Sequence, residues 1–297
     1  MMLGLEGEDT SVAAARGWAL AALRAAGIDT ADIDVRRLLA ATLGVSAAHL
    51  LARPELRLSA EEAQLFAARI QRRLAREPVS RILGRQQFYG RSFAVSPATL
   101  DPRPDSEALI EAALEIVGLE GWTGAPLRML DIGTGTGCLL LTLLAELPQA
   151  YGVGTDLSPA ALAVARDNAT TLGLEGRVTW CAGDLLENVE GDFHMVLCNP
   201  PYLRSAEIAM LEPEVSRFDP RLALDGGADG LQIFRRLSAR ISGVIGRGWI
   251  LLEVGAGQAE AVADLLRQAP AIGSAADVRF YTDVSGRRRC VAARTRN

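Results

Sequence analysis

The chain of 297 residues contains no lysine, and all 31 of its basic residues are arginine. Without a lysine to reach a phosphate, a P-loop nucleotide site is excluded. Histidine is also scarce, with two residues, and cysteine occurs four times. The four cysteines, Cys138, Cys181, Cys198 and Cys290, form no C-x-x-C pair, which disfavours a zinc site and fits a reducing compartment. We therefore predict no metal centre.

Long apolar runs are absent as well. No stretch reaches the eighteen apolar residues typical of a membrane span, and the acidic residues 1–9 lack the basic-then-apolar pattern of a signal peptide. With 49% hydrophobic and 23% charged residues, the composition is that of a globular protein. We expect a cytoplasmic protein with one large or two unequal domains.

Acidic residues are unevenly distributed. Residues 1–100 contain 13 arginines and 10 acidic residues, whereas the remainder contains 18 arginines and 26 acidic residues. An acidic larger part is a poor surface for gripping nucleic acid by its phosphates. Direct binding of nucleic acid is therefore not expected.

The first 80 residues are predicted to form a small helical domain. Alanine, leucine and arginine recur there with helical spacing, which predicts helices at 11–26, 31–43, 46–52 and 60–76. Ser59 and Glu62 fit a capping box at the start of the last helix. Four arginines share one face of that helix, either as a solvated face or as a docking surface for an acidic partner: Arg69, Arg72, Arg73 and Arg76.

A linker is expected at residues 81–104. Glu77-Pro78 should end the helical bundle, and Ile82–Gly84 and Phe88–Phe93 predict a β-hairpin. The segment 97–105 is too rich in proline for a helix or an interior strand, and Asp105 should cap a helix that ends near residue 117.

The remaining part, 105–297, predicts an α/β fold with a doubly wound, mostly parallel sheet, because strands and helices alternate from residue 127 onward. Strands are predicted at 127–132, 151–156, 178–182, 193–198 and 249–254, with helices at 138–147, 159–172, 231–245 and 257–268. The last two strands, 278–282 and 290–294, should form an antiparallel hairpin.

A glycine-rich loop follows the first of these strands: Gly133, Thr134, Gly135, Thr136 and Gly137. Its G-x-G-x-G spacing differs from the G-x-G-x-x-G of dinucleotide sites. Asp156 ends the next strand, where an acid can accept from both hydroxyls of a ribose. Asp184 follows the third strand, placed to accept from an adenine amino group, and Leu185 would cover the ring. An acidic pocket without a phosphate cradle suits an adenosine ligand that carries positive charge, and S-adenosylmethionine is such a ligand.

The second motif is a stiff turn after the apolar strand that ends at Cys198: Asn199, Pro200, Pro201 and Tyr202. Two prolines stop the strand, and the carboxyl end of a buried strand is where open α/β sheets place ligands. The Asn199 side-chain oxygen and the Pro200 carbonyl could accept the two hydrogens of a planar –NH2 group, held between Pro201 and Tyr202. Taken alone, the four residues fit an ordinary Pro-Pro turn equally well.

Taken together and in order, these motifs resemble those of class I methyltransferases. Three further segments are similar to the release-factor glutamine N5-methyltransferases, the HemK/PrmC family: 93–107, 218–227 and 283–287. The helical N-terminus and the hairpin also match that family's layout, so the resemblance covers nearly the whole chain. Asp101, Ser106 and Leu185 depart from its usual residues, which are an apolar residue, threonine and often an aromatic residue.

The resemblance implies methyl transfer from S-adenosylmethionine to the glutamine amide nitrogen in the Gly-Gly-Gln loop of a class I peptide-chain release factor, with S-adenosylhomocysteine as product. The helical domain would hold the body of this partner. Catalysis and substrate binding are assigned to Asn199, Pro200, Pro201 and Tyr202. Cofactor binding is assigned to Gly133, Thr134, Gly135, Thr136, Gly137, Asp156, Asp184, Leu185 and Asn199.

Two other functions remain open from the residues themselves. The same turn could grip the exocyclic amino group of a base in DNA or RNA, although such enzymes need a basic cleft or a recognition domain. The chain could also be a non-catalytic adenosine-binding module or a dehydrogenase, and the glycine spacing disfavours the latter.

Overall fold

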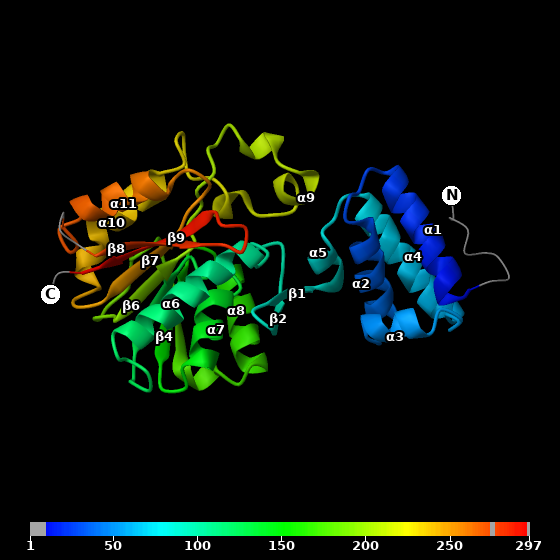
Figure 1. The fold of residues 1–297 in the computed structure, drawn as a ribbon, viewed down its shortest axis with the longest axis horizontal. Helices are drawn as coiled ribbons and strands as arrows, with labels where there is room; N and C mark the ends of the chain where they lie inside the picture. The colour runs from blue at the N-terminus through cyan, green and yellow to red at the C-terminus, as the bar shows by residue number, and fades with distance from the viewer. Residues whose placement is uncertain (1–9, 274–276, 296–297) are drawn as a thin grey trace. The chain divides into compact units, whose positions relative to one another are not determined.

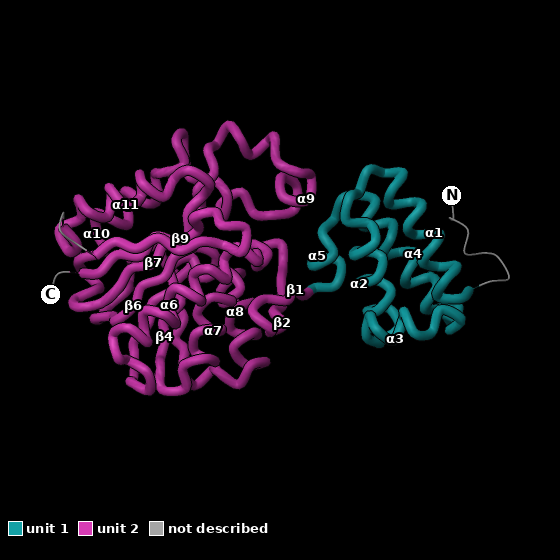
Figure 2. The backbone as a smooth tube through the Cα atoms, viewed as in Figure 1, with its two compact units in different colours: residues 1–84 teal, residues 85–297 magenta. Residues whose placement is uncertain are grey.

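The computed structural model describes residues 10–273 and 277–295, which form two compact units, residues 1–84 and residues 85–297 (Figure 2). Residues 1–9, on which the expectation of no signal peptide depends, lie outside the described residues. Among the helices that the structure describes, none is long and apolar enough to cross a membrane.

The first unit is a bundle of helices with its own apolar core. The four predicted helices are present, and the capping box of Ser59 and Glu62 is formed. A further helix follows them, so the prediction that the bundle ends at Glu77-Pro78 is wrong. This helix begins after Pro78 and buries Val79 and Ile82 in the bundle core. The helices are α1 (Val12–Ala25), α2 (Ala31–Leu43), α3 (Ala47–Ala52), α4 (Ala60–Leu74) and α5 (Val79–Leu83).

The arginine stripe of α4 makes contacts inside this unit. Arg73 is only 5% exposed, and its Nε donates to Asp34 Oδ2 at 2.8 Å. The other three arginines donate to Thr42 Oγ1, to the Glu77 carboxylate and to the Gly27 carbonyl: Arg69, Arg72 and Arg76, respectively. The stripe therefore joins the helices of the bundle to one another and is not simply a solvated face.

We expect Arg73→Ala to destabilise the helical unit by about 3–5 kcal/mol, because it leaves the Asp34 carboxylate buried without its ion partner. Urea unfolding of the full chain, followed by circular dichroism, measures this loss. Arg72→Ala is the matched control, since its pair with Glu77 is partly exposed and should contribute less than about 1 kcal/mol. Equal losses for the two variants would contradict a special role for the buried pair.

The hairpin of β1 (Arg85–Phe88) and β2 (Arg91–Ala94) belongs to the second unit. Phe88 and Phe93 point inward, meet edge to face with ring centroids 6.3 Å apart, and join the core of that unit. The Asn168 side chain makes two hydrogen bonds with the backbone of Ala94: its Oδ1 accepts from the Ala94 N–H, and its Nδ2 donates to the Ala94 carbonyl. The predicted linker 81–104 is therefore divided between the two units. Residues 81–83 belong to helix α5 of the first unit, whereas the hairpin is anchored in the core of the second unit by Phe88 and Phe93.

The second unit is built on a seven-stranded sheet, and the predicted doubly wound, mostly parallel α/β architecture is confirmed (Figure 1). The order of strands is β5-β4-β3-β6-β7-β9-β8. The first five in this order are parallel. The predicted antiparallel hairpin of β8 and β9 is confirmed, and β9 also runs antiparallel to β7, which was not predicted. The strands are β3 (Arg128–Ile132), β4 (Tyr151–Asp156), β5 (Val178–Ala182), β6 (Met195–Cys198), β7 (Trp249–Glu253), β8 (Val278–Thr282) and β9 (Arg288–Arg294).

Helices cover both faces of this sheet because its central strands are apolar on both sides. Alternate residues, such as Met129 and Leu130 of β3, enter different cores. One core packs against α6 (Glu107–Leu119), α7 (Cys138–Glu146) and α8 (Pro159–Thr171), and the other against α10 (Gln232–Arg240) and α11 (Ala259–Gln268). The helix predicted at 231–245 is shorter, since α10 ends at Arg240 and a 3₁₀ turn, η5 (Ile241–Gly243), follows.

The order of strands reverses between β3 and β6. Consecutive strands β3, β4 and β5 run toward one edge, whereas β6 and β7 lie on the other side of β3. Loops at the carboxyl ends of β3 and β6 therefore diverge and leave a crevice, which is the usual place for a ligand in such sheets. The glycine loop follows β3 and the Asn199 turn follows β6, so the fold brings the two motifs to the same crevice.

Candidate functional site

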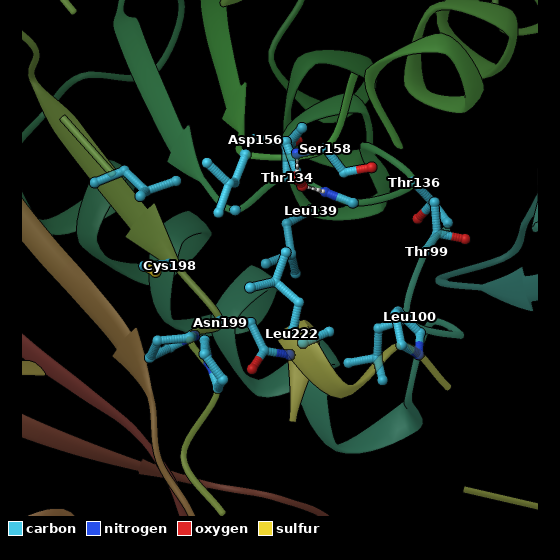
Figure 3. A pocket seen from close by; sticks show the side chains of 18 of the residues that line it. Thr99, Leu100, Thr134, Thr136, Leu139, Asp156, Ser158, Cys198, Asn199 and Leu222 are labelled. Atoms are coloured by element: carbon cyan, nitrogen blue, oxygen red, sulfur yellow. Dashed lines mark hydrogen bonds between the residues drawn. The ribbon is translucent and has the colours of Figure 1, made fainter. Parts of the chain in front are cut away.

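A cavity of about 240 Å³ lies at the carboxyl ends of β3, β4, β5 and β6 (Figure 3). Thr134, Asp156 and Ser158 stand at one end of the view and Asn199 and Leu222 at the other, with Leu139 between them. Most of the predicted site residues line this cavity: Gly133, Thr134, Gly135, Thr136, Asp156, Asp184, Leu185, Asn199, Pro200 and Pro201. Gly137 and Tyr202 do not.

The glycine loop is open where it faces the cavity. Gly133 and Gly135 have φ angles of +71° and +55°, and nothing lies within 4 Å of a Cβ placed on either. Glycine is therefore required there by backbone conformation, and a ligand can approach closely. Gly137 has a different role, because its Cβ would lie 3.0 Å from Leu141 and 3.2 Å from Trp180. Gly137 thus allows α7 to pack, and it does not contact the cavity.

Asp156 ends β4 beside this loop. Its Oδ2 accepts from the Gly135 N–H at 2.9 Å, and its Oδ1 accepts from the Ser158 N–H at 2.8 Å. Burial raises the pKa of this carboxyl, and the backbone donors oppose that shift. Each oxygen still has a lone pair for a further donor, so the carboxylate can receive two adjacent hydroxyl groups.

Asp184 has a partner that sequence reasoning missed. The Arg236 guanidinium of α10 lies 2.6 Å from Asp184 Oδ2, and both side chains line the cavity. The two residues are 52 positions apart, so only the folded chain reveals the pair. Leu185 follows in a left-handed conformation with φ of +59°, and its carbonyl accepts from Thr155 Oγ1 at 3.2 Å.

The Asn199 turn is held from both sides. Asn199 Nδ2 donates to Ser106 Oγ at 3.2 Å, and no described peptide bond is cis, the Asn199-Pro200 bond included. Gly226 packs directly on the turn, where an added Cβ would lie 2.7 Å from the Pro201 carbonyl oxygen. The backbone of Leu203 then pairs with residues 224 and 226. The glycines of the 218–227 segment thus permit this close approach.

Tyr202 points away from the cavity. Its hydroxyl donates to Glu253 Oε1 at 3.3 Å, and its carbonyl accepts from Gln258 Nε2 at 2.9 Å. Glu253 is only 1% exposed, and burial raises its pKa to about 7. The expectation that Tyr202 presents a flat face to a substrate stays a prediction, and in this structure the ring braces the turn from behind. Sequence reasoning treated Glu253 only as part of a buried strand.

Two ion pairs hold the proline-rich segment. Arg103, which lines the cavity, pairs with Asp219, whose side chain is 1% exposed. Asp105 pairs with Arg289 of β9 at 2.6 Å. The prediction that Asp105 caps a helix is wrong: a 3₁₀ turn, η1 (Pro104–Ser106), precedes α6, and the Asp105 carboxylate is used by Arg289 instead. The pair formed by Arg103 joins two of the segments on which the family resemblance depends.

In the described part of the chain, no group of three or more metal-ligating side chains comes together. The cavity instead offers an acid beside an open glycine loop at one end and an amide oxygen beside two prolines at the other. These groups fit the adenosine ligand expected from the sequence, because Asp156 can hold a ribose and the open glycine loop leaves room beside it.

Comparison with known proteins extends this result. Residues 14–84 match the family model of the PrmC N-terminal domain, and residues 120–212 match that of the methyltransferase small domain. The chain is 46% identical over 275 residues to the release factor glutamine methyltransferase of Rhodospirillum rubrum, covering 92% of this chain and 82% of that protein. Its identity to the protein of that name from Bradyrhizobium diazoefficiens is 44%, and the match covers 96% of this chain and 95% of that protein.

Among solved structures, the catalytic domain of hMettl16 in complex with the MAT2A 3′UTR hairpin 6 is similar, with a TM-score of 0.54 over 80% of this chain and 83% of that one. At 15% identity this likeness concerns the fold alone. The curated relatives are far more similar and are matched along most of their length. The chain therefore belongs to the release factor glutamine methyltransferase family.

Proposed function

We propose that this protein transfers a methyl group from S-adenosylmethionine to the side-chain amide nitrogen, N5, of the glutamine in the Gly-Gly-Gln loop of a class I release factor. The observation that carries the proposal is one cavity lined both by the glycine loop with Asp156 and by the Asn199 turn, in a member of this family. A cytoplasmic location follows from the proposed partner, which acts where translation ends.

The end of the cavity near β4 and β5 would hold the donor. Asp156 accepts from the two ribose hydroxyls, and Gly133 and Gly135 leave the space that the donor needs. Oδ1 of Asp184 accepts from the adenine amino group while Oδ2 remains paired with Arg236. Leu185 covers the ring. When bound, S-adenosylmethionine supplies a methyl group on a positively charged sulfur.

The end near β6 would hold the glutamine amide. An amide nitrogen is a poor nucleophile because its lone pair is delocalised into the carbonyl group. Asn199 Oδ1 and the Pro200 carbonyl accept its two N–H hydrogens, which draws electron density back to nitrogen and fixes its direction. Positioning of this kind can lower the activation free energy by about 7–11 kcal/mol when the reacting groups are well oriented. A strong general base is unnecessary, because the proton leaves after the nitrogen has been methylated.

The helical unit would hold the body of the release factor. We expect deletion of residues 1–84 to raise KM for the release factor strongly while leaving the donor Kd within about twofold, because the second unit retains both cores around the sheet. Steady-state kinetics and calorimetry with S-adenosylmethionine measure the two quantities. Unchanged KM for whole release factor would contradict this role for the unit.

The experiment that tests the function is transfer of labelled methyl to purified release factor. The expected result is label on the Gly-Gly-Gln glutamine, located by peptide mass spectrometry, and no label on the same release factor with that glutamine changed to alanine. Label that enters oligonucleotides and not the release factor would instead support the base-methylating alternative.

A further inference from the structure

An ion pair at the donor end of the cavity joins the loop after β5 to helix α10. Arg236 Nη2 donates to Asp184 Oδ2 at 2.6 Å, and both side chains line the cavity. Among the residues that the structure describes, Arg236 is the only hydrogen-bond donor to this carboxylate. The side chains of Arg236 and Asp184 are 39% and 42% exposed. A half-exposed pair contributes little to folding stability, so its place beside a binding site points to a role in binding.

The backbone that carries Asp184 is attached to the end of β4. The Gly183 N–H donates to the Asp156 carbonyl at 3.1 Å, and the Leu185 carbonyl accepts from Thr155 Oγ1 at 3.2 Å. The acid assigned to the ribose and the acid assigned to the adenine therefore stand at a fixed backbone spacing. These contacts hold only the backbone, so the Asp184 carboxylate can still turn about its own side-chain bonds.

Helix α10 is the rigid partner in the pair. Phe234 and Leu237 are fully buried in the core on this side of the sheet, and Ile233 and Arg236 line the cavity. Residues that lie one turn apart share a face of a helix, so packing of the buried face fixes the face that meets the cavity. Arg236 therefore reaches the Asp184 carboxylate from a packed helix and can stop it from turning.

The lining of the cavity leaves the recognition of a purine ring to hydrogen bonds. No aromatic side chain is among the described residues that line it, so a ring bound there has no aromatic partner for stacking. Leu185 and Ile233 offer apolar contact, which distinguishes poorly between rings of similar shape. Discrimination between purines must then come from the edge of the ring, where Asp184 is the charged acceptor.

The ion pair decides what this carboxylate can accept. With Oδ2 taken by Arg236, Oδ1 is the oxygen that remains for a ligand, and an ionised carboxylate only accepts. An amino group on the ring donates to Oδ1, whereas an oxo group in the same place would set acceptor against acceptor. A carboxylate that is free to turn could accept instead from the ring N–H that an oxo-bearing purine carries beside its oxo group.

We propose that Arg236 is a positioning residue for the methyl donor, which holds the Asp184 carboxylate so that the site selects an amino-bearing purine over an oxo-bearing one. The proposal rests on the proposed function, since it takes the donor end of the cavity to bind the adenosine part of S-adenosylmethionine. Arg236 acts through Asp184 and is assigned no contact of its own with the ligand.

Calorimetry on the full chain gives the first test, with S-adenosylhomocysteine and its deaminated analogue S-inosylhomocysteine. The parent protein should bind the adenosine compound about 10- to 100-fold more tightly, the usual contribution of a hydrogen bond to a charged group. Arg236→Ala should raise the Kd for S-adenosylhomocysteine about fivefold or more and leave that for S-inosylhomocysteine within about twofold. The ratio of the two Kd values should therefore fall.

Two further variants control this measurement. Arg236→Lys keeps a positive charge and a donor and should recover most of the selectivity. Arg235→Ala is the matched control, because Arg235 is the next residue of α10, pairs with Asp229 and does not line the cavity. Both of its Kd values should match those of the parent. The unfolding temperatures of all variants should stay near that of the parent, since both ion pairs are partly exposed.

A double variant gives the second test. Asp184→Ala alone should remove most of the preference for the amino-bearing ring. Adding Arg236→Ala should change the Kd for S-adenosylhomocysteine by less than about twofold more, because Arg236 acts through a carboxylate that is then absent. A further large loss would show that Arg236 binds the ligand directly, and it would overturn the inference.

The outcomes distinguish the inference from the proposed function, because binding is measured without release factor. A parent protein that binds S-adenosylhomocysteine but fails to methylate release factor overturns the proposed function alone. A parent that binds neither compound overturns the donor site, and the inference with it. The inference alone is overturned by equal affinity of the parent for the two compounds, or by an Arg236→Ala variant that weakens both equally. A fall in selectivity that Arg236→Lys restores and Arg235→Ala does not reproduce supports it.

Discussion

Asn199→Ala should reduce kcat for release factor methylation by about 100-fold or more, while the Kd for S-adenosylmethionine changes by less than about twofold. Removing one preorganised polar group that acts mainly in the transition state typically costs 10²–10³-fold in rate. Asn199 meets this description because it lines the cavity and its Nδ2 donates to Ser106, which leaves its Oδ1 as the atom that can accept from a substrate. Single-turnover kinetics at saturating donor measure the rate, and calorimetry measures the Kd.

A conservative variant sharpens this experiment. Asn199→Gln keeps the amide but moves it by one methylene, so it should remain strongly impaired if position matters more than chemical type. Equal losses of rate and donor affinity in Asn199→Ala would show that the residue only shapes the donor end of the cavity, and the proposed grip on the substrate amide would then be abandoned.

Asp156→Ala should have the opposite effect to Asn199→Ala: a large loss of donor affinity and a small change in kcat. The donor Kd should rise by about 10- to 100-fold, since a hydrogen bond to a charged group contributes about 1.5–3 kcal/mol. At saturating donor, kcat should recover most of its value, because Asp156 belongs to the end of the cavity opposite Asn199 in Figure 3. Calorimetry and the dependence of rate on donor concentration measure the two effects.

The control for this variant is Asp167→Ala on the exposed surface of α8, which should change neither quantity. Asp156 also accepts from the backbone of Gly135 and Ser158, so a thermal melt must show that Asp156→Ala remains folded. A kcat at saturating donor that stays as low as that of Asn199→Ala would contradict the separation of the cavity into a donor end and an acceptor end.

Local patterns explain why so much of the fold was predictable. The alternation of apolar strands with helices indicates a parallel sheet, and in such a sheet the carboxyl ends of neighbouring strands lie at one edge. The glycine loop after β3, Asp156 after β4 and Asn199 after β6 were each recognisable from a few consecutive residues. The structure brings all three to one cavity, as that rule requires.

Partners that lie far apart in the chain were beyond sequence reasoning. Asn199 and Ser106 are separated by 93 positions, Arg103 and Asp219 by 116, and Tyr202 and Glu253 by 51. A hydroxyl or carboxyl on an apolar segment has no periodic signature, so Ser106 appeared only as a departure from a family pattern and Glu253 as part of a buried strand.

The amino-acid sequence by itself determined the alternation of strands and helices, the glycine loop and the proline-stiffened turn, because these depend on local patterns and on backbone conformations that particular residues favour or forbid. Only the tertiary structure decided that the Tyr202 hydroxyl donates to Glu253, that Arg236 pairs with Asp184, and that the Asn199 amide donates to Ser106. Those outcomes depend on where a buried polar group finds its partner, and the partner is chosen by packing across the whole chain.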